Sequence, residues 1–325
     1  MLLFSSNAAA QSIGVCYGQV GNNLPPAKEV IDDLFKANNI GRMRIYNPNQ
    51  ATLEALRDSN IDVVIGVPNE DIQSIANDVS SATNWVQNNI LTYSQNVKFS
   101  YIVVGNEIDP TNDPTSQFVL HAMENIYSAL VSANLNLQIK VSLAINIGLL
   151  GSSYPPSTGA FSASSISYIT PIVNFLVSNG APLLANVYPY FAYIGNKQSI
   201  SLDYALFKQQ GNNDVGYQNL FDAQLDSVYA ALEKVGGSNV KIIVSESGWP
   251  SAGEDSANIE NAATYYANLI NHVKSGNGTP KRPGEAIETY LFALFDENQK
   301  PGAATEQHFG LFNPDKSPKY QLGFL

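Results

Sequence analysis

Two glutamates stand at the ends of short apolar runs in this sequence. Glu107 closes the run Val103-Val104-Gly105-Asn106-Glu107, and Glu246 follows Ile243-Val244-Ser245. Apolar runs of this length are typical of buried parallel strands. A carboxylate at such a place is costly to bury unless other groups compensate its charge. Because paired carboxylates carry out glycoside hydrolysis, the two glutamates predict a site for that chemistry.

The elements that must position these glutamates alternate along the chain. Strand-like runs recur with helical patterns between them, which predicts parallel pairing and right-handed crossovers. Eight such repeats predict a single (β/α)8 TIM barrel, with an open doubly wound sheet as the alternative. The predicted strands cover residues 13–17, 42–46, 62–67, 99–105, 140–144, 184–188, 241–245 and 289–295. We expect one catalytic domain over residues 11–325, since no linker divides the chain.

Apolar residues between these runs recur at the spacing of a helix face. Pro25-Pro26 is a plausible first turn for the earliest of these helices. The predicted apolar stripes are Val30, Ile31, Leu34 and Phe35; Ile72, Ile75 and Val79; Leu225, Val228, Tyr229 and Leu232; and Tyr265, Tyr266, Leu269, Ile270 and Val273.

Two connections are too long for simple turns. Residues 146–161 contain Tyr154-Pro155-Pro156, and residues 189–219 are rich in aromatic side chains that include Phe191. Both follow predicted strands, so both belong to the C-terminal face, where barrels keep their active sites. Long loops in a compact domain are usually functional, which predicts an open substrate cleft. The alternative for the second loop is a structural insertion with its own aromatic cluster.

Polar and aromatic residues gather at the predicted strand ends. Sugar rings stack on aromatic faces, and their hydroxyls pair with amides and carboxylates. Asn106 is placed to bond a sugar 2-hydroxyl, although capping of the strand end is an alternative. Lys300 would favour ionised carboxylates nearby, unless it is a solvated loop lysine. The predicted substrate-binding residues are Tyr46, Asn106, Asn186, Tyr188, Phe191, Trp249, Phe295, Glu297, Lys300 and Glu306.

Several of these runs resemble one family. The stretches 13–18, 44–46, 104–107, 186–190, 244–251 and 295–300 are similar to those of plant endo-β-1,3-glucanases of glycoside hydrolase family 17, in the expected order. The resemblance implies a barrel, a retaining mechanism and a long cleft for β-1,3-glucan. It implies that Glu107 is the acid/base and Glu246 the nucleophile, with Glu297, Lys300 and Glu306 around them. Pathogenesis-related members also imply defence against fungal walls.

Composition excludes several other classes of function. The 325 residues are 44% hydrophobic and 14% charged, with a net charge of −11. This charge disfavours nucleic acid and anionic membranes but does not repel a neutral polysaccharide. Cys16 is expected to be a buried thiol, and the three histidines lie too far apart for metal-ligand spacing. No run approaches the roughly 18 apolar residues of a membrane span. We therefore expect a monomer without metal or cofactor.

Both ends of the sequence bear on localisation. Residues 1–10 resemble the remnant of a secretory signal, with Ala8-x-Ala10 before Gln11; a native start without structure is the alternative. The sequence ends at Gly323-Phe324-Leu325, without the vacuolar extension that some relatives carry. Together with the acidic charge, this predicts an extracellular protein of the apoplast, or a vacuolar one if an extension was removed.

Two rival functions remain at this stage. A hydrolase of mixed-linkage β-1,3;1,4-glucan would share the same catalytic motifs, because loop contacts at the ends of the cleft decide the linkage. A non-catalytic glucan-binding or storage protein would be expected to lack a catalytic glutamate, whereas both are present. Endo-hydrolysis of β-1,3-glucan is therefore the prediction.

Overall fold

The computed structural model describes residues 13–322. Eight parallel strands close into a barrel in the order β1-β10-β9-β8-β5-β4-β3-β2, which confirms the predicted TIM barrel. The barrel strands are β1 (Ile13–Cys16), β2 (Arg42–Ile45), β3 (Asp62–Val67), β4 (Lys98–Asn106), β5 (Lys140–Asn146), β8 (Leu183–Asn186), β9 (Ile242–Ser247) and β10 (Thr289–Leu291). The predicted signal remnant and the last three residues lie outside the described part of the chain.

Helices follow the strands along the chain, as the alternating pattern predicted. The α-helices are α2 (Ala27–Glu29), α3 (Gln50–Ala55), α4 (Ile72–Asn77), α5 (Val79–Val86), α6 (Ser116–Ser132), α7 (Ile166–Asn179), α8 (Pro189–Gly195), α9 (Leu202–Ala205), α10 (Leu220–Lys234) and α11 (Ile259–Ser275). Wider π-helical turns form η1 (Val30–Lys36) and η3 (Gln87–Leu91). Tighter 3₁₀ turns form η2 (Asn69–Asp71), η4 (Ile147–Leu149), η5 (Pro156–Thr158) and η6 (Ala304–Gln307).

The predicted helical stripes are buried, with one exception. The stripes of η1, α10 and α11 all belong to the core. Val79, however, is 60% exposed, so its assignment to the stripe of Ile72 and Ile75 was wrong. The side chain of Asp78 accepts a hydrogen bond from the Ser80 backbone N–H and starts a new helix there. This cap ends the periodicity of α4 before Val79 is reached.

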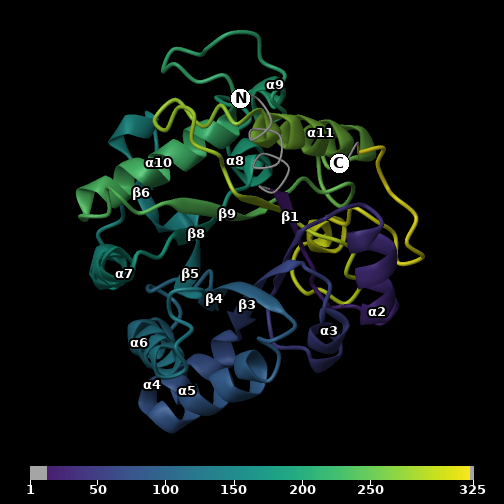
Figure 1. Ribbon diagram of the computed structural model, residues 1–325. Coiled ribbons are helices and arrows are strands. Elements are labelled where there is room, and N and C mark those ends of the chain that lie inside the picture. Colours follow the sequence, from purple (N-terminus) through teal and green to yellow (C-terminus); the bar gives the residue numbers. More distant parts are fainter. Residues whose placement is uncertain (1–12, 323–325) are drawn as a thin grey trace, which may run out of the picture. The chain divides into compact units, whose positions relative to one another are not determined.

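The chain divides into two compact units, which are described separately. One unit comprises residues 44–186 and 227–243. In it, β3, β4, β5 and β8 pair in parallel. The helices α4, α5 and α6 pack together, in blue to teal in Figure 1. Asn146 on β5 pairs with Asn186 on β8, so polar residues meet at the carboxyl end of this part of the sheet.

The second unit contains the remaining described residues. In it, β10 pairs with β1 on one edge and with β9 on the other. The Cys16 thiol is buried and donates to the Ser245 carbonyl at 3.3 Å, which joins β1 to β9. The helix α11 buries its aromatic stripe in this unit.

Most strand ends differ from the sequence prediction by one to four residues, as three examples show. The strand β8 ends at Asn186, and Val187 instead donates its N–H to the Glu246 carbonyl. The strand β10 ends at Leu291, because Ala293 and Leu294 donate to Phe309 and Cys16 instead of a strand ladder. Glu246 lies inside β9, whereas the prediction placed it after the strand.

Both long connections contain local structure. The first forms an antiparallel hairpin of β6 (Leu150–Ser152) and β7 (Ala160–Phe161), flanked by the turns η4 and η5. The second contains the short helices α8 and α9. The single catalytic domain over residues 11–325 stays a prediction.

Candidate active site

The backbone turns sharply where β4 delivers Glu107. The pairing of β4 with β5 shifts register between Val103 and Asn106, and Gly105 has a φ of 88°. A bulge of this kind re-aims the side chains that follow it. Glu107 itself has a φ of 53°, a left-handed conformation that costs a residue with a Cβ roughly 1–2 kcal/mol. Strain of this kind is characteristic of functional positions, and here it leaves the Glu107 side chain exposed.

A chain of oriented amides holds the Glu107 carboxylate. Asn186 donates from Nδ2 to Glu107 Oε1 at 2.8 Å. Arg44, which is buried, donates to Asn186 Oδ1 at 3.1 Å and to Asn106 Oδ1 at 2.7 Å. Because the guanidinium has only donors, it fixes both amide oxygens toward itself and turns the Asn186 NH₂ group toward Glu107. The side chain of Asn69 completes the support by bonding both the N–H and the carbonyl of Asn106, at 2.9 and 3.1 Å.

Arg44 and Asn69 were missed as site residues. Arg44 lies in the predicted strand 42–46, where an arginine between Met43 and Ile45 breaks the apolar run and was the available signal. Its guanidinium also lies 4.6 Å from the ring centre of Tyr46, a predicted sugar-binding residue. Asn69 follows Pro68 in an ordinary polar loop, so no pattern in the sequence marks it.

Glu246 has different surroundings in the other unit. Its side chain is only 5% exposed, and Tyr188 donates its hydroxyl to Glu246 Oε2 at 2.6 Å. The pairing of β9 with β10 shifts register between Val244 and Ser247, so this glutamate also lies at an irregular point of its strand. A hydrogen bond from a phenol to a carboxylate is short and strong. The arrangement is suited to holding a carboxylate in one orientation.

Charged residues predicted around Glu246 lie in the same unit. Glu297 is buried, and its Oε1 accepts the Val20 backbone N–H at 2.8 Å. Burial raises the pKa of Glu297, and the nearby charges of Glu246 and Glu306 raise it further. The Val20 hydrogen bond and the Lys300 ammonium oppose this increase in the pKa. Glu297 therefore adds a second buried carboxyl group close to the negative charge of Glu246.

Lys300 belongs to the same electrostatic group. Its Nζ lies 3.4 Å from Glu306 Oε2 and 4.1 Å from the centre of the Phe292 ring. The structure thus brings together Glu246, Glu297, Lys300 and Glu306, the charged set that the family resemblance implied. A single ammonium among three carboxylates reduces their mutual repulsion.

Aromatic residues near Glu246 separate into two kinds. Tyr188 is half-buried and Phe191 is 43% exposed, with their ring centres 5.4 Å apart. Trp249 is 0% exposed and Phe295 is 1% exposed. Neither of these buried rings presents a face to solvent, which differs from the expectation that they stack on sugar. We infer that Trp249 and Phe295 instead stabilise the segments around them.

Contacts of the two buried rings explain this difference. The indole Nε1 of Trp249 donates to the Ser256 carbonyl at 2.9 Å, and its ring packs 5.0 Å from that of Tyr190. Phe295 contacts the Tyr17 ring edge-on at 6.4 Å. The sequence marks such residues as aromatic, but it does not show which of them become core.

Other kinds of site are not seen in the described residues. Within residues 13–322, no three His, Cys, Asp or Glu side chains gather into a potential metal site. No helix in that range is both long and apolar enough to cross a membrane.

Comparisons with known proteins cover nearly the whole chain. A family model described as "Glycosyl hydrolases family 17" matches residues 13–324. A glucan endo-1,3-beta-glucosidase of Vitis vinifera is 58% identical over 330 aligned residues, which cover 100% of this chain and 95% of that protein. The acidic isoform GL153 of Nicotiana tabacum is 58% identical, covering 97% of this chain and 88% of its own.

Solved structures agree with these sequence relatives. CJP38, a beta-1,3-glucanase and allergen of Cryptomeria japonica pollen, has a TM-score of 0.93 and 49% identity, covering 96% of this chain and 99% of its own. One of two plant beta-glucan endohydrolases with distinct substrate specificities has a TM-score of 0.90 and 44% identity, covering 95% and 99%. Together with the match over residues 13–324, these similarities place the chain in glycosyl hydrolase family 17.

Proposed function

We propose that this protein hydrolyses internal β-1,3-glucosidic bonds of β-1,3-glucans. The observation that carries the proposal is the 58% identity over the full chain to a relative named glucan endo-1,3-beta-glucosidase. Glu107, which accepts a hydrogen bond from Asn186, and Glu246, which accepts one from Tyr188, add a chemical basis for it. The proposed substrate is a neutral β-glucan, which the net charge of −11 on the protein does not repel.

In the first step, Glu246 attacks the anomeric carbon and Glu107 protonates the departing glycosidic oxygen. The bond from C1 to that oxygen breaks, and an ester bond from C1 to a Glu246 oxygen forms. In the second step, Glu107, now a carboxylate, takes a proton from water, whose oxygen displaces Glu246 from C1. The product keeps the β configuration. This retaining course requires the two carboxyl groups to be about 5–5.5 Å apart.

The surrounding residues have distinct parts in this scheme. Tyr188 fixes the nucleophile, and Asn186 fixes the acid/base. Asn106, held by Arg44 and Asn69, is oriented for a hydrogen bond to a sugar hydroxyl. Phe191 offers an exposed ring face on which a sugar can stack. Lys300 limits the repulsion that Glu297 would otherwise exert on the nucleophile.

The test is digestion of laminarin by the purified protein. We expect short β-1,3-linked oligosaccharides early in the reaction, because an endo-enzyme cuts within the chain. Glu246→Ala protein prepared in parallel is the control for contaminating glucanases. Release of glucose alone from chain ends, or no cleavage above that control, would contradict the proposal.

A hydrolase of mixed-linkage glucan is the second candidate. One solved relative comes from a study of two plant endohydrolases that differ in substrate specificity, so linkage preference varies within this fold. Parallel digestion of barley-type mixed-linkage glucan decides between the two: faster cleavage of that polymer than of laminarin would favour the second candidate. Binding of both polymers without cleavage would point instead to a glucan-binding or storage protein.

Localisation, defence and oligomeric state complete the proposal. We propose a secreted, monomeric enzyme that acts on fungal walls, on the basis of the cleavage-site pattern before Gln11 and the family's β-glucan substrates. Mass analysis of protein secreted from its native source should show Gln11 as the first residue, and light scattering should give one chain. Retention of Met1 in that material would argue against secretion.

A further inference from the structure

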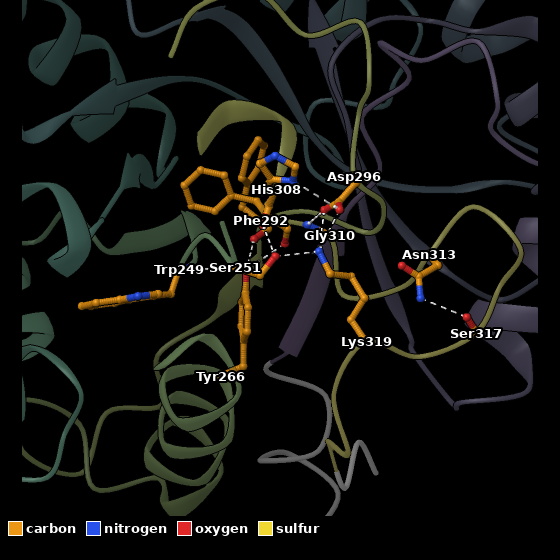
Figure 2. A network of polar contacts seen from close by, with 11 residues as sticks. Trp249, Ser251, Tyr266, Phe292, Asp296, His308, Gly310, Asn313, Ser317 and Lys319 are labelled. Carbon is orange, nitrogen blue, oxygen red and sulfur yellow. Dashed lines mark hydrogen bonds and ion pairs between the residues drawn. The ribbon is translucent and has the colours of Figure 1, made fainter. Parts of the chain in front are cut away.

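Lys319 joins three segments of the chain through one buried ammonium group. Its Nζ lies 2.8 Å from both carboxylate oxygens of Asp296 and 2.8 Å from Ser251 Oγ. Figure 2 draws these contacts as dashed lines. The Lys319 side chain is only 9% exposed. An ammonium withdrawn from water to this degree is strongly dependent on its partners.

The partners of Lys319 stand next to candidate site residues. Asp296 directly precedes Glu297, and Ser251 follows β9 by four residues. Asp296 Oδ1 also accepts the Gly310 N–H at 2.8 Å, and Ser251 donates from its N–H and its hydroxyl to the His308 carbonyl, at 2.9 and 3.0 Å. One ion pair therefore fastens the segments after β9 and β10 to the last part of the described chain.

A tyrosine hydroxyl reinforces this junction from within. Tyr266 on α11 is fully buried, and its hydroxyl hydrogen-bonds to the carbonyls of Phe292 and Phe309. The Trp249 N–H lies 3.4 Å from the same oxygen. Tyr266 thus joins the segments that follow β9 and β10 a second time, which limits the freedom of the backbone around Asp296.

Glu297 has little room in which to move. A Cβ added at Gly18 would lie 2.4 Å from both oxygens of the Glu297 carboxyl, so the carboxyl packs directly against the Gly18 backbone. The groups that face this carboxyl are the Val20 N–H, the ammonium of Lys300 and the carboxylates of Glu246 and Glu306. A small displacement of Glu297 would therefore change the electrostatic field at Glu246.

We propose that the Asp296–Lys319 ion pair positions Glu297 and the segment after Glu246 for catalysis. Both members are positioning residues that act through their neighbours rather than through contact with substrate. The inference rests on the proposed function, since it assigns these residues to the same hydrolytic reaction.

The test compares Lys319→Met with Lys316→Met on laminarin. Lys316 lies on the same segment, but its Nζ pairs with Glu29 at 2.6 Å and Asp33 at 2.7 Å on the surface. We expect Lys319→Met to lower kcat about 10- to 100-fold, as a displacement of about 1 Å in a site can do, with KM little changed. Lys316→Met should retain the kcat of the unaltered protein. Rates are divided by the folded fraction, measured by circular dichroism at the assay temperature.

Asp296→Asn separates positioning from a simple charge effect. Its amide oxygen can still accept from Gly310, so the variant has a better prospect of folding than one that removes the side chain. Removing the positive charge of Lys319 and removing the negative charge of Asp296 would change the electrostatic field in opposite directions. Both changes break the same ion pair, so we expect kcat to fall in both variants, with KM little changed. The His308 ring, 3.7 Å from Asp296, keeps its acidic neighbour in Lys319→Met and loses it in Asp296→Asn.

The outcomes distinguish this inference from the proposed function. Opposite changes of kcat in Lys319→Met and Asp296→Asn, or a folded Lys319→Met protein with the kcat of Lys316→Met, would overturn the positioning role. In either case the unaltered protein would still cleave laminarin. Loss of cleavage by the unaltered protein would instead refute the proposed function.

Discussion

Glu107 and Glu246 differ in how their surroundings hold the carboxylate. Glu107 is exposed, follows a bulge in a left-handed backbone conformation and accepts from an amide that Arg44 orients. Glu246 is buried within its strand and accepts from the hydroxyl of Tyr188. One carboxylate is fixed by strained backbone and directed amides, and the other by burial and a short bond to a phenol.

We propose that this difference serves the two tasks of a retaining glycosidase. The group that activates water in the second step must be accessible to water, which the exposure of Glu107 allows. A nucleophile must meet the anomeric carbon from one direction, and burial with a strong hydrogen bond limits the orientations of Glu246. The roles of the two glutamates stay a proposal, which the following experiments test.

The largest effects should come from removing each carboxylate. We expect Glu246→Ala to lose more than about 10⁴-fold in kcat on polysaccharide, because the covalent step is gone. Azide should enter the vacated space and give an α-glycosyl azide. Glu107→Ala should lose about 10²- to 10⁴-fold on polysaccharide but much less on an aryl glucoside, whose leaving group needs no proton. There azide should intercept the glycosyl-enzyme and give the β-azide.

Product configuration by NMR decides this experiment. A β-azide from the Glu246 variant would reverse the two assignments. Wild-type products of inverted configuration would reject the two-step mechanism, whichever glutamate is the acid. Glu260→Ala, which removes a glutamate from the first turn of α11, controls for general effects of mutation.

Much of this arrangement was predictable from the sequence, because the barrel follows from a repeated pattern. Apolar runs alternating with amphipathic stripes predict parallel strands and helices, and the ends of strands fix which residues share a face. The positions of Asn186 and Tyr188 near the glutamates follow from that logic. Family resemblance then gave the roles that spacing alone leaves open.

The remaining features depend on tertiary contacts that no local pattern contains. The bulge before Glu107 requires the register of β4 against β5, and Gly105 alone does not specify it. Burial of Trp249 depends on Tyr190 and Tyr193, which lie on α8. The role of Arg44 depends on Asn186, a residue 142 positions away in the chain.

An intermediate effect should come from the two hydrogen bonds that hold the carboxylates. Hydrogen bonds to charged groups contribute about 1.5–3 kcal/mol, so Tyr188→Phe should lower kcat/KM about 10- to 100-fold on both laminarin and an aryl glucoside. Asn186→Ala should lower it mainly on laminarin, since it affects the acid. Steady-state kinetics on the two substrates measures this contrast.

Tyr190→Phe is the matched control for Tyr188→Phe. Its hydroxyl bonds the Asp255 carbonyl at 3.3 Å, outside the immediate surroundings of Glu246. We expect it to retain most activity. If Tyr188→Phe kept its kcat/KM on the aryl glucoside, as Asn186→Ala should, the two hydrogen bonds would not act on different steps. The proposed distinction between Glu107 and Glu246 would then be contradicted.

The smallest effect concerns the stability cost of negative charge near Glu246. Burial raises the pKa of Glu297 above its ordinary value of 4.5, so the folded state holds this proton more tightly than the unfolded state. The resulting stabilisation is fully present below the unfolded pKa and is lost as pH rises through the folded pKa. Glu297→Gln keeps an acceptor for the Val20 N–H but cannot ionise. The free energy of unfolding of the unaltered protein should therefore fall relative to that of the variant between about pH 4 and neutrality.

Glu54→Gln gives a control of opposite sign. The hydrogen bond from Arg57 lowers the pKa of Glu54 on the surface, so its contribution is present above the unfolded pKa and lost as pH falls. Urea unfolding at several pH values measures both differences. The unaltered protein should lose stability against Glu297→Gln and gain it against Glu54→Gln as pH rises, although the surface effect is small. A Glu297 difference of the same sign as the Glu54 difference would mean that burial does not dominate the pKa of Glu297. The proposed contrast between an exposed Glu107 and a buried Glu246 would then lose its electrostatic basis.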